Sequence, residues 1–331
     1  MKRLTVWVLI LAMALATVAT FGTMAMAKQI TVAMLPKVLG EPYFIASQKG
    51  AELAAKELGI KFIFDGPVTA DVTKQIEMID NYITRGVDVI AVSPNDANAI
   101  APILKKAMSK GIKVITWDAD AVPSARNFFV NQVTYEGVGK ALVDVLADEI
   151  GGKGEVAIVT ASLTAANQNN WIKYMKEELK DYPGMKLVDI RPSEEDQQLA
   201  FQVTTDLMTA YPNLRGVFAI TSVAFPGAAE AIKQAGKGGK VAVTGLSTPK
   251  SMAKYVHEGV VKNVVLWDPG DLGYLAMYVA KQLVDGKMPR PGTDGTITAG
   301  KLGKIQVKAD GEVILGPPTV FTARNIDKFD F

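Results

Sequence analysis

Short runs of β-branched and aromatic residues alternate with longer segments of helical periodicity from residue 28 onward. This alternation is typical of βα units that feed a parallel sheet. In the first half it predicts strands at 30–35, 61–64, 87–92, 113–116 and 127–130, and helices at 43–58, 73–85 and 99–110. In the second half it predicts helices at 135–150, 170–180, 197–210, 224–234 and 249–258, and strands at 155–160, 186–190, 216–220 and 240–244. We therefore expect an α/β protein with two doubly wound parallel-sheet lobes in series.

The last part of the chain adds one more predicted unit, a strand at 261–267 and a helix at 272–285. After residue 296 the pattern predicts hairpin strands with a turn at 309–311. A closed (β/α)8 barrel has the same alternation over this length and is the alternative fold. Two lobes are favoured, because a closed barrel leaves no natural place for a second half or a terminal hairpin.

The first residues predict an exported protein. Lys2 and Arg3 precede an apolar run at 4–21, and Ala-Met-Ala at 25–27 fits the small-x-small pattern of a cleavage site. We expect a signal peptide over residues 1–27; a membrane anchor is the alternative, but the run is short and interrupted by threonines. The chain has no cysteine to form a disulfide or carry a lipid, so the periplasm is the expected location.

Composition excludes several classes of function. The 36 basic residues nearly balance the 34 acidic ones without any basic run, so nucleic acid is not an expected partner. His257 is the only histidine, which excludes a Ser-His-Asp triad and a histidine-rich metal site. The chain also lacks glycine-rich phosphate-binding motifs, so we expect neither a metal nor a cofactor, and no enzymatic activity. A glycosidase that uses Asp118 and Asp120 as acid and base is the alternative.

Polar residues follow the predicted strands, where the ligand crevice of an open parallel sheet lies. Each of them can also be a helix cap or a turn residue, but Lys37 and Asp118 directly follow apolar strands and are favoured as ligand contacts. Carboxylates, amides, hydroxyls and one ammonium suit sugar hydroxyls, while aromatic planes suit the C–H face of a sugar ring. The candidates from these two groups are Lys37, Tyr43, Phe44, Asn95, Asp118, Asp120, Asn167, Gln168, Trp171, Ser222, Trp267 and Asp268.

Several motifs carry more specific information. They are Leu-Pro-Lys at 35–37, Thr-Trp-Asp-Ala-Asp at 116–120, Asn-Gln at 167–168, Leu-Trp-Asp at 266–268 and Asn-Ile-Asp-Lys-Phe-Asp-Phe at 325–331. With the rest of the mature chain they resemble the periplasmic sugar-binding proteins of ABC importers, of the ribose-binding-like type I. Within that group the resemblance is to the rhamnose-binding and autoinducer-2-binding branch.

The resemblance implies two lobes joined by a hinge of about three crossings, near residues 131–132, 262–266 and 299. The N-terminal lobe would comprise 28–131 plus 265–298, and the C-terminal lobe 132–264 plus 299–331. A monomer that closes around its ligand would deliver it to the permease subunits of an ABC transporter in the inner membrane.

The resemblance also bears on the ligand. Of six positions that contact autoinducer-2 in its receptors, Lys37, Asp118 and Gln168 match, whereas Asn167, Ile220 and Ser222 replace an aspartate, a proline and an alanine. The tail from residue 299 is similar to that of rhamnose-binding members. L-rhamnose, or a related deoxy sugar or pentose, is therefore the leading ligand, and autoinducer-2 is the alternative. Ile220, Phe44 or Trp267 could supply the apolar wall that the methyl group of a 6-deoxy sugar needs.

Overall fold

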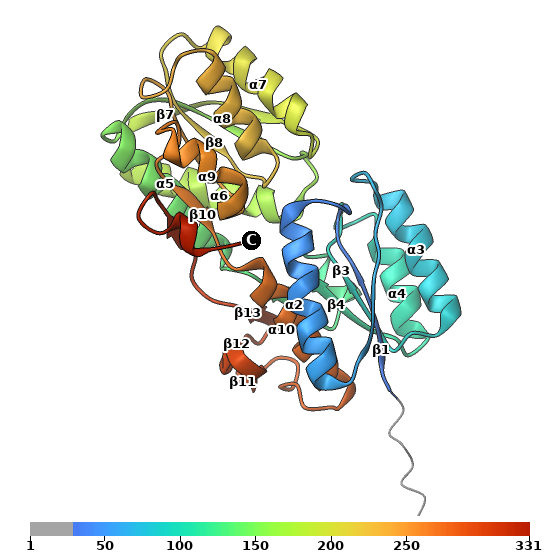
Figure 1. Ribbon diagram of the computed structural model, residues 1–331. Coiled ribbons are helices and arrows are strands. Elements are labelled where there is room, and N and C mark those ends of the chain that lie inside the picture. Colours follow the sequence, from blue (N-terminus) through green and yellow to red (C-terminus); the bar gives the residue numbers. More distant parts are fainter. Residues whose placement is uncertain (1–28) are drawn as a thin grey trace, which may run out of the picture.

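The computed structural model describes residues 29–331, and the predicted signal peptide lies outside these residues. Figure 1 shows two lobes, one containing α2, α3 and α4 and the other α5 to α9. Each lobe is built on its own open sheet, one of eight strands and one of four. The prediction of two doubly wound lobes is therefore confirmed, and the barrel alternative is wrong.

The first lobe follows the predicted βα rhythm closely. Its sheet has the order β11-β12-β13-β5-β4-β3-β1-β2, and the strands from β5 to β2 run parallel. Successive elements are β1 (Thr31–Leu35), α2 (Pro42–Leu58), β2 (Lys61–Phe64), α3 (Val72–Arg85), β3 (Val89–Val92), α4 (Ala101–Ser109), β4 (Lys113–Trp117) and β5 (Phe128–Asn131).

The second lobe repeats the pattern in a sheet of order β7-β6-β8-β9, which is parallel throughout. A bridge from Leu246 to Val265 places β10 beside this sheet. Its elements are α5 (Tyr135–Ile150), β6 (Lys153–Thr160), α6 (Ala166–Glu178), β7 (Gly184–Pro192), α7 (Gln197–Ala210), β8 (Leu214–Ala219), α8 (Ala224–Gln234), β9 (Ala242–Gly245), α9 (Pro249–His257) and β10 (Val264–Leu266).

The end of the chain departs from the predicted lobe boundary. Residues 299–331 were expected in the second lobe, but β12 (Lys304–Val307) and β13 (Glu312–Ile314) belong to the sheet of the first. The physical reason is the parallel pairing of β13 with β5, which buries Val313 opposite Val130. Only the segment with β14 (Thr319–Phe321) returns to the second lobe, where it pairs antiparallel with β10.

The third crossing between the lobes therefore lies at residues 315–318, not near 299. It runs beside the first crossing, because the Leu315 N–H donates to the Asn131 carbonyl at 2.9 Å and the Gly316 N–H to the Gln132 carbonyl at 3.2 Å. The second crossing leads from β10 into α10 (Pro269–Val284). β11 (Gly295–Thr298), which follows α10, forms the edge of the first lobe's sheet.

Helices α2 and α10 cross at very short range, side by side in the middle of Figure 1. A Cβ added to Gly50 would lie 1.8 Å from the Gly270 carbonyl oxygen, and one added to Gly273 would lie 1.9 Å from that of Ser47. Only glycine permits such an approach between backbones. Among the helices of residues 29–331, none has both the length and the apolar character that crossing a bilayer requires.

Candidate functional site

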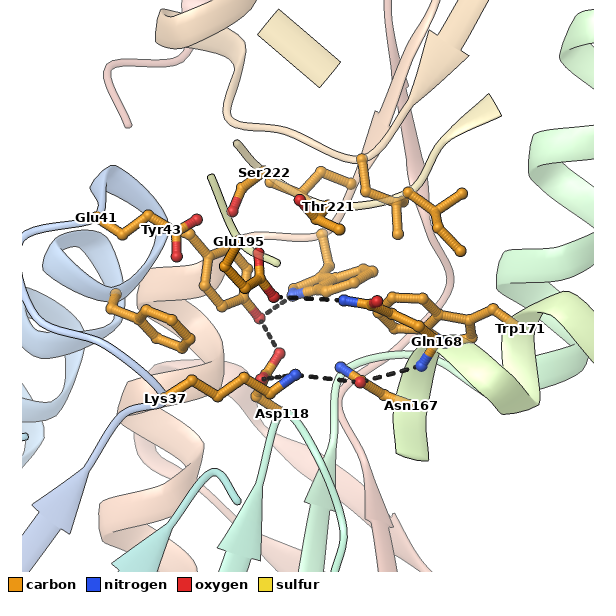
Figure 2. Close-up of a pocket in the computed structure, with 15 residues that line it drawn as sticks. Lys37, Glu41, Tyr43, Asp118, Asn167, Gln168, Trp171, Glu195, Thr221 and Ser222 are labelled. Atoms are coloured by element: carbon orange, nitrogen blue, oxygen red, sulfur yellow. Dashed lines mark hydrogen bonds and ion pairs between the residues drawn. The ribbon is translucent and has the colours of Figure 1, made fainter. Parts of the chain in front are cut away.

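A cavity of about 380 Å³ lies between the two lobes (Figure 2). Its walls come from the ends of β1 and β4 and from α2 on one side, and from α6 and the loops after β7, β8, β9 and β10 on the other. The lining residues are Lys37, Glu41, Tyr43, Phe44, Asp118, Asn167, Gln168, Trp171, Glu195, Ile220, Thr221, Ser222, Leu246, Leu266 and Trp267.

Ten of the thirteen residues predicted from the sequence line this cavity, and their contact with a ligand stays a prediction. The structure brings them together from six separate stretches of the chain, as expected for a cavity at the carboxyl ends of parallel strands. They are Lys37, Tyr43, Phe44, Asp118, Asn167, Gln168, Trp171, Ile220, Ser222 and Trp267.

Asp120 lies outside the cavity and has a structural role. Its carboxylate forms a paired ion contact with Arg126, with the Nη2–Oδ2 distance at 2.8 Å and the Nε–Oδ1 distance at 2.8 Å. It also accepts hydrogen bonds from the Thr116 hydroxyl and the Ala121 N–H. Asp118 and Asp120 therefore do not share a site, and the acid and base pair of the glycosidase alternative is wrong.

Asn95 and Asp268 were also predicted as ligand contacts, but neither lines this cavity. Asn95 donates its side-chain N–H to the Lys37 carbonyl at 3.0 Å and lines a neighbouring cavity instead. Asp268 caps α10 by accepting from the N–H groups of Gly270 and Asp271 at 2.8 and 3.1 Å. Both side chains are used to hold backbone that carries other site residues.

Lys37, Asp118 and Tyr43 form a buried polar network on the first lobe, seen at the lower left of Figure 2. The Tyr43 hydroxyl donates to Asp118 Oδ1 at 3.1 Å and accepts from Trp267 Nε1 at 2.9 Å. Lys37 Nζ lies 3.9 Å from Asp118 Oδ2. The network fixes the carboxylate and the ammonium side by side, an arrangement that suits a pair of neighbouring hydroxyls.

The backbone at Asp118 is held in an uncommon conformation. Its φ is 62°, in the left-handed region, and the Ser93 hydroxyl donates to Oδ2 at 2.7 Å. Non-glycine residues in this region cost free energy and gather at functional sites. The turn of the backbone also separates Asp118, which faces the cavity, from Asp120, which does not.

A buried glutamine holds the Lys37 loop in place. Gln75 on α3 donates to the carbonyls of Pro36 at 3.0 Å and Ser93 at 2.8 Å. Its oxygen accepts from the Asn95 N–H at 2.9 Å. These bonds tie the loops after β1 and β3 together, so the position of Lys37 depends on a side chain outside the cavity.

The second lobe presents Asn167 and Gln168 from the first turn of α6. Asn167 Oδ1 accepts from Lys37 Nζ at 3.2 Å, a hydrogen bond that joins the two lobes across the cavity. Gln168 Oε1 accepts from the Thr160 hydroxyl and the Ala161 N–H, both at 2.7 Å, so its amide N–H group points toward Glu195. Nε1 of the neighbouring Trp171 is buried without a hydrogen-bond partner among the described residues.

Five lining residues were not among the predicted contacts: Glu41, Glu195, Thr221, Leu246 and Leu266. Glu41 immediately precedes a proline at the first turn of α2, where an acidic residue suggests helix stabilisation. Glu195 lies in the loop between β7 and α7 with φ at 54°. This left-handed conformation is usually indicated by a glycine or an asparagine, and the loop has neither at this position. The two leucines follow or end strands that the pattern identified only as core.

Burial raises the pKa of Glu41 well above its ordinary value of 4.5, and repulsion from Glu195 and Asp118 outweighs attraction to Lys37. The pKa of Glu195 is raised as well, mainly by burial, although Lys37 opposes the shift. In the folded protein these carboxyl groups therefore retain protons that they lose in the unfolded chain. The stabilisation that these protons give the folded protein is fully present below pH 4.5. It is lost as the pH rises through the pKa values that the two groups have in the folded state.

We therefore expect the Glu41→Gln variant to gain stability relative to the wild type as the pH of the ligand-free protein rises from 4.5 to about 8. Glutamine keeps the shape of the side chain and removes the group whose ionised form is disfavoured. Urea unfolding at each pH gives the two free energies. Glu52→Gln, at an exposed position of the same helix, is the control and should follow the wild type. A constant difference between Glu41→Gln and the wild type would contradict this account.

The cavity offers no cluster that could hold a metal. Within residues 29–331 no group of three or more histidine, aspartate or glutamate side chains has a suitable arrangement. The lining suits hydrogen bonding to a small polar molecule, because polar groups lie beside aromatic and aliphatic side chains.

The chain resembles known proteins over most of its length. Residues 32–288 match the family model described as periplasmic binding protein domain. The D-allose-binding periplasmic protein of Escherichia coli is 28% identical over 264 residues, 77% of this chain and 84% of that protein. The ribose import binding protein of Bacillus subtilis is 26% identical over 264 residues, 78% of this chain and 83% of that protein.

Solved structures show the same fold. An ABC transporter solute-binding protein of Clostridium phytofermentas with bound L-rhamnose is 33% identical, with a TM-score of 0.86 over 91% of this chain and 98% of its own. LsrB of Clostridium saccharobutylicum in complex with AI-2 is 28% identical, with a TM-score of 0.86 over 91% and 100%. The family model, the two-lobed architecture and the cavity between the lobes agree: the chain belongs to the periplasmic binding proteins, with the type I fold.

Proposed function

We propose that this protein is exported to the periplasm, binds one small sugar between its lobes and presents it to an ABC importer. The observation that carries the proposal is the cavity itself, where polar groups of both lobes converge with aromatic rings. The relatives and structures named above include allose-, ribose- and rhamnose-binding proteins, which supports a sugar as the ligand. The permease subunits of the importer would be its protein partner.

L-rhamnose, or a related deoxy sugar or pentose, is the ligand that we favour. Ile220, Leu246 and Leu266 provide an aliphatic patch in the cavity wall, which suits the methyl group of a 6-deoxy sugar. The similar structure from Clostridium phytofermentas contains L-rhamnose. Autoinducer-2 is the second candidate, supported by the similarity to LsrB, but Asn167, Ile220 and Ser222 differ from the residues expected for that ligand.

Hinge closure follows from the placement of the polar groups. Lys37 and Asp118 belong to one lobe, whereas Asn167 and Gln168 belong to the other. A ligand can bind all four only when the lobes approach each other, so binding favours the closed state by this difference in contacts. Three crossings side by side, at residues 131–132, 266–268 and 315–318, supply the hinge.

We expect calorimetry of the purified mature protein to detect saturable binding of at least one member of a sugar panel. The panel contains L-rhamnose, L-fucose, D-ribose, D-allose, D-arabinose and autoinducer-2. Buried groups that lose their partners discriminate strongly against a stereoisomer, so we expect affinities to differ by roughly a hundredfold or more within the panel. A flat response to every compound, with no thermal stabilisation, would refute the proposed function.

A further inference from the structure

The charges that line the cavity do not balance. Among its lining residues Lys37 is the single basic one, against three acidic ones, Glu41, Asp118 and Glu195. Lys37 already forms an ion pair with Asp118 and donates a hydrogen bond to Asn167 Oδ1 at 3.2 Å. No ion pair within residues 29–331 involves Glu41 or Glu195, so a cationic ligand group would supply the counter-ion that stabilises their ionised form.

Glu41 is the clearest sign that a ligand group is expected here. Only 8% of the residue is exposed, and its Oε1 is buried without a hydrogen-bond partner among the described residues. A buried carboxylate oxygen without a donor is costly, so a group that supplies a donor and positive charge would bind it strongly. Figure 2 shows the carboxyl groups of Glu41 and Glu195 at the same end of the cavity, near the ring of Tyr43.

Glu195 faces Glu41 from the other lobe. Glu194 and Glu195 both have positive φ, 51° and 54°, and the loop is fixed by the Glu194 N–H, which donates to the Ala161 carbonyl at 2.7 Å. Such a conformation costs free energy that a glycine would avoid, yet the sequence has glutamates here. The strain is consistent with a function for the Glu195 carboxyl group in the cavity.

The aromatic rings of the cavity favour a cation as well. Tyr43, Trp171 and Trp267 form a connected cluster, with centroids 6.1 Å apart between Tyr43 and Trp267 and 6.0 Å apart between Trp171 and Trp267. The faces of such rings attract an ammonium group as well as the C–H face of a sugar. A cation between carboxylates and rings would also relieve the repulsion between Glu41 and Glu195.

We propose that the cleft prefers a sugar that carries a protonated amine, and that Glu41 and Glu195, one from each lobe, receive the ammonium group. The inference rests on the proposed function and narrows the ligand class of the same site. The neighbouring cavity supports it, because the acidic residues Asp96, Glu194 and Glu195 outnumber the basic Lys37 in its lining.

The test compares each neutral sugar with its amino-deoxy and N-acetylamino counterparts by calorimetry at pH 7. Suitable sets are galactose with galactosamine and N-acetylgalactosamine, and rhamnose with a 4-amino-4,6-dideoxyhexose and its N-acetyl form. We expect at least one amino sugar to bind ten times or more tightly than its neutral parent. The N-acetyl form, which keeps the nitrogen but loses the charge, should lose that gain.

The variants Glu41→Gln and Glu195→Gln assign the preference to residues. Each should weaken the binding of the amino sugar at least fivefold more than it weakens the binding of the neutral parent. Glu52→Gln removes the same charge from an exposed position of α2 and should not change the ratio of the two affinities. Two variants in different lobes keep the test usable if one of them folds poorly.

The outcomes separate the two proposals. If neutral sugars bind and no amino form binds more tightly than its parent, the preference for an amine is overturned while the sugar-binding function stands. A preference that persists in both glutamine variants would also overturn the assignment to Glu41 and Glu195. If no compound of either kind binds, the proposed function itself fails, and the inference fails with it.

Discussion

Asp118→Asn should weaken sugar binding by about 2 kcal/mol or more, roughly thirtyfold in Kd, because a buried carboxylate that accepts ligand hydroxyls becomes a neutral amide. Asparagine tolerates the left-handed backbone that Asp118 adopts at φ 62°, so the loop should keep its shape. Ser93 and Tyr43 donate to different oxygens of Asp118, and the single carbonyl oxygen of asparagine keeps one of these two hydrogen bonds. Calorimetry gives the affinity and urea unfolding the stability.

Asp120→Asn is the matched variant two residues later, and it should lower stability instead of affinity. Asp120 pairs with the buried Arg126 and does not line the cavity. Removing its charge leaves the guanidinium without a counter-ion and should lower the free energy of unfolding by about 3 kcal/mol, with affinity nearly unchanged. If Asp118→Asn kept wild-type affinity, or Asp120→Asn lost affinity without losing stability, the assigned roles would be wrong.

Gly273→Ala should destabilise the first lobe by about 3 kcal/mol or more. The new Cβ would lie 1.9 Å from the Ser47 carbonyl oxygen and 2.8 Å from its carbonyl carbon, so two helix backbones must separate. Because α2 carries Tyr43 and Phe44 and α10 follows Trp267, the shift should also weaken ligand binding. Urea unfolding and calorimetry measure the two effects.

Gly238→Ala provides the comparison for this glycine. A Cβ there meets no atom within 4 Å, and the residue is not in the left-handed region. Its replacement should change the free energy of unfolding by less than about 1 kcal/mol. If the two alanine variants were equally stable, the contact between the backbones of α2 and α10 would not limit which residues their packing tolerates.

The strands and helices of the two lobes were predictable because the sequence pattern of each element is local. Each strand and helix of residues 31–266 has its own hydrophobic period and turn residues, and predicted and observed elements differ mainly at their ends. The boundary at the C-terminus was not predictable in this way. Whether β13 pairs with β5 or with a strand of the second lobe depends on contacts between residues about 180 positions apart, for which periodicity contains no information.

The site was predictable where strand geometry delivers the side chain. Lys37, Asp118 and Ser222 lie at or just beyond strand ends, and the parallel sheets bring them to the cavity. The same rule failed for Asp120 and Asp268. Asp268 caps a helix, which is another common role of short polar side chains at strand ends. Asp120 is turned away from the cavity by the backbone conformation of Asp118.

Glu41 and Glu195 could not be predicted, because their place in the cavity depends on loop conformation. Glu41 resembles an ordinary acidic residue before a helix, and the sequence pattern does not indicate that it is buried. Glu195 enters the cavity through two successive residues with positive φ. Neither feature has a signal in residue type or spacing, yet these side chains determine the charge that a ligand meets.

The division of the first lobe along the chain has a consequence for the order in which the protein can assemble. Its sheet needs β1 to β5 and also β13, so the central strand β5 lacks its last neighbour until residue 314 is available. The four strands of the other lobe's sheet all come from residues 153–245, and only β10 and β14 join beside it later. A chain that emerges with its N-terminus first can therefore complete the four-stranded sheet before the eight-stranded one, which must wait for β13.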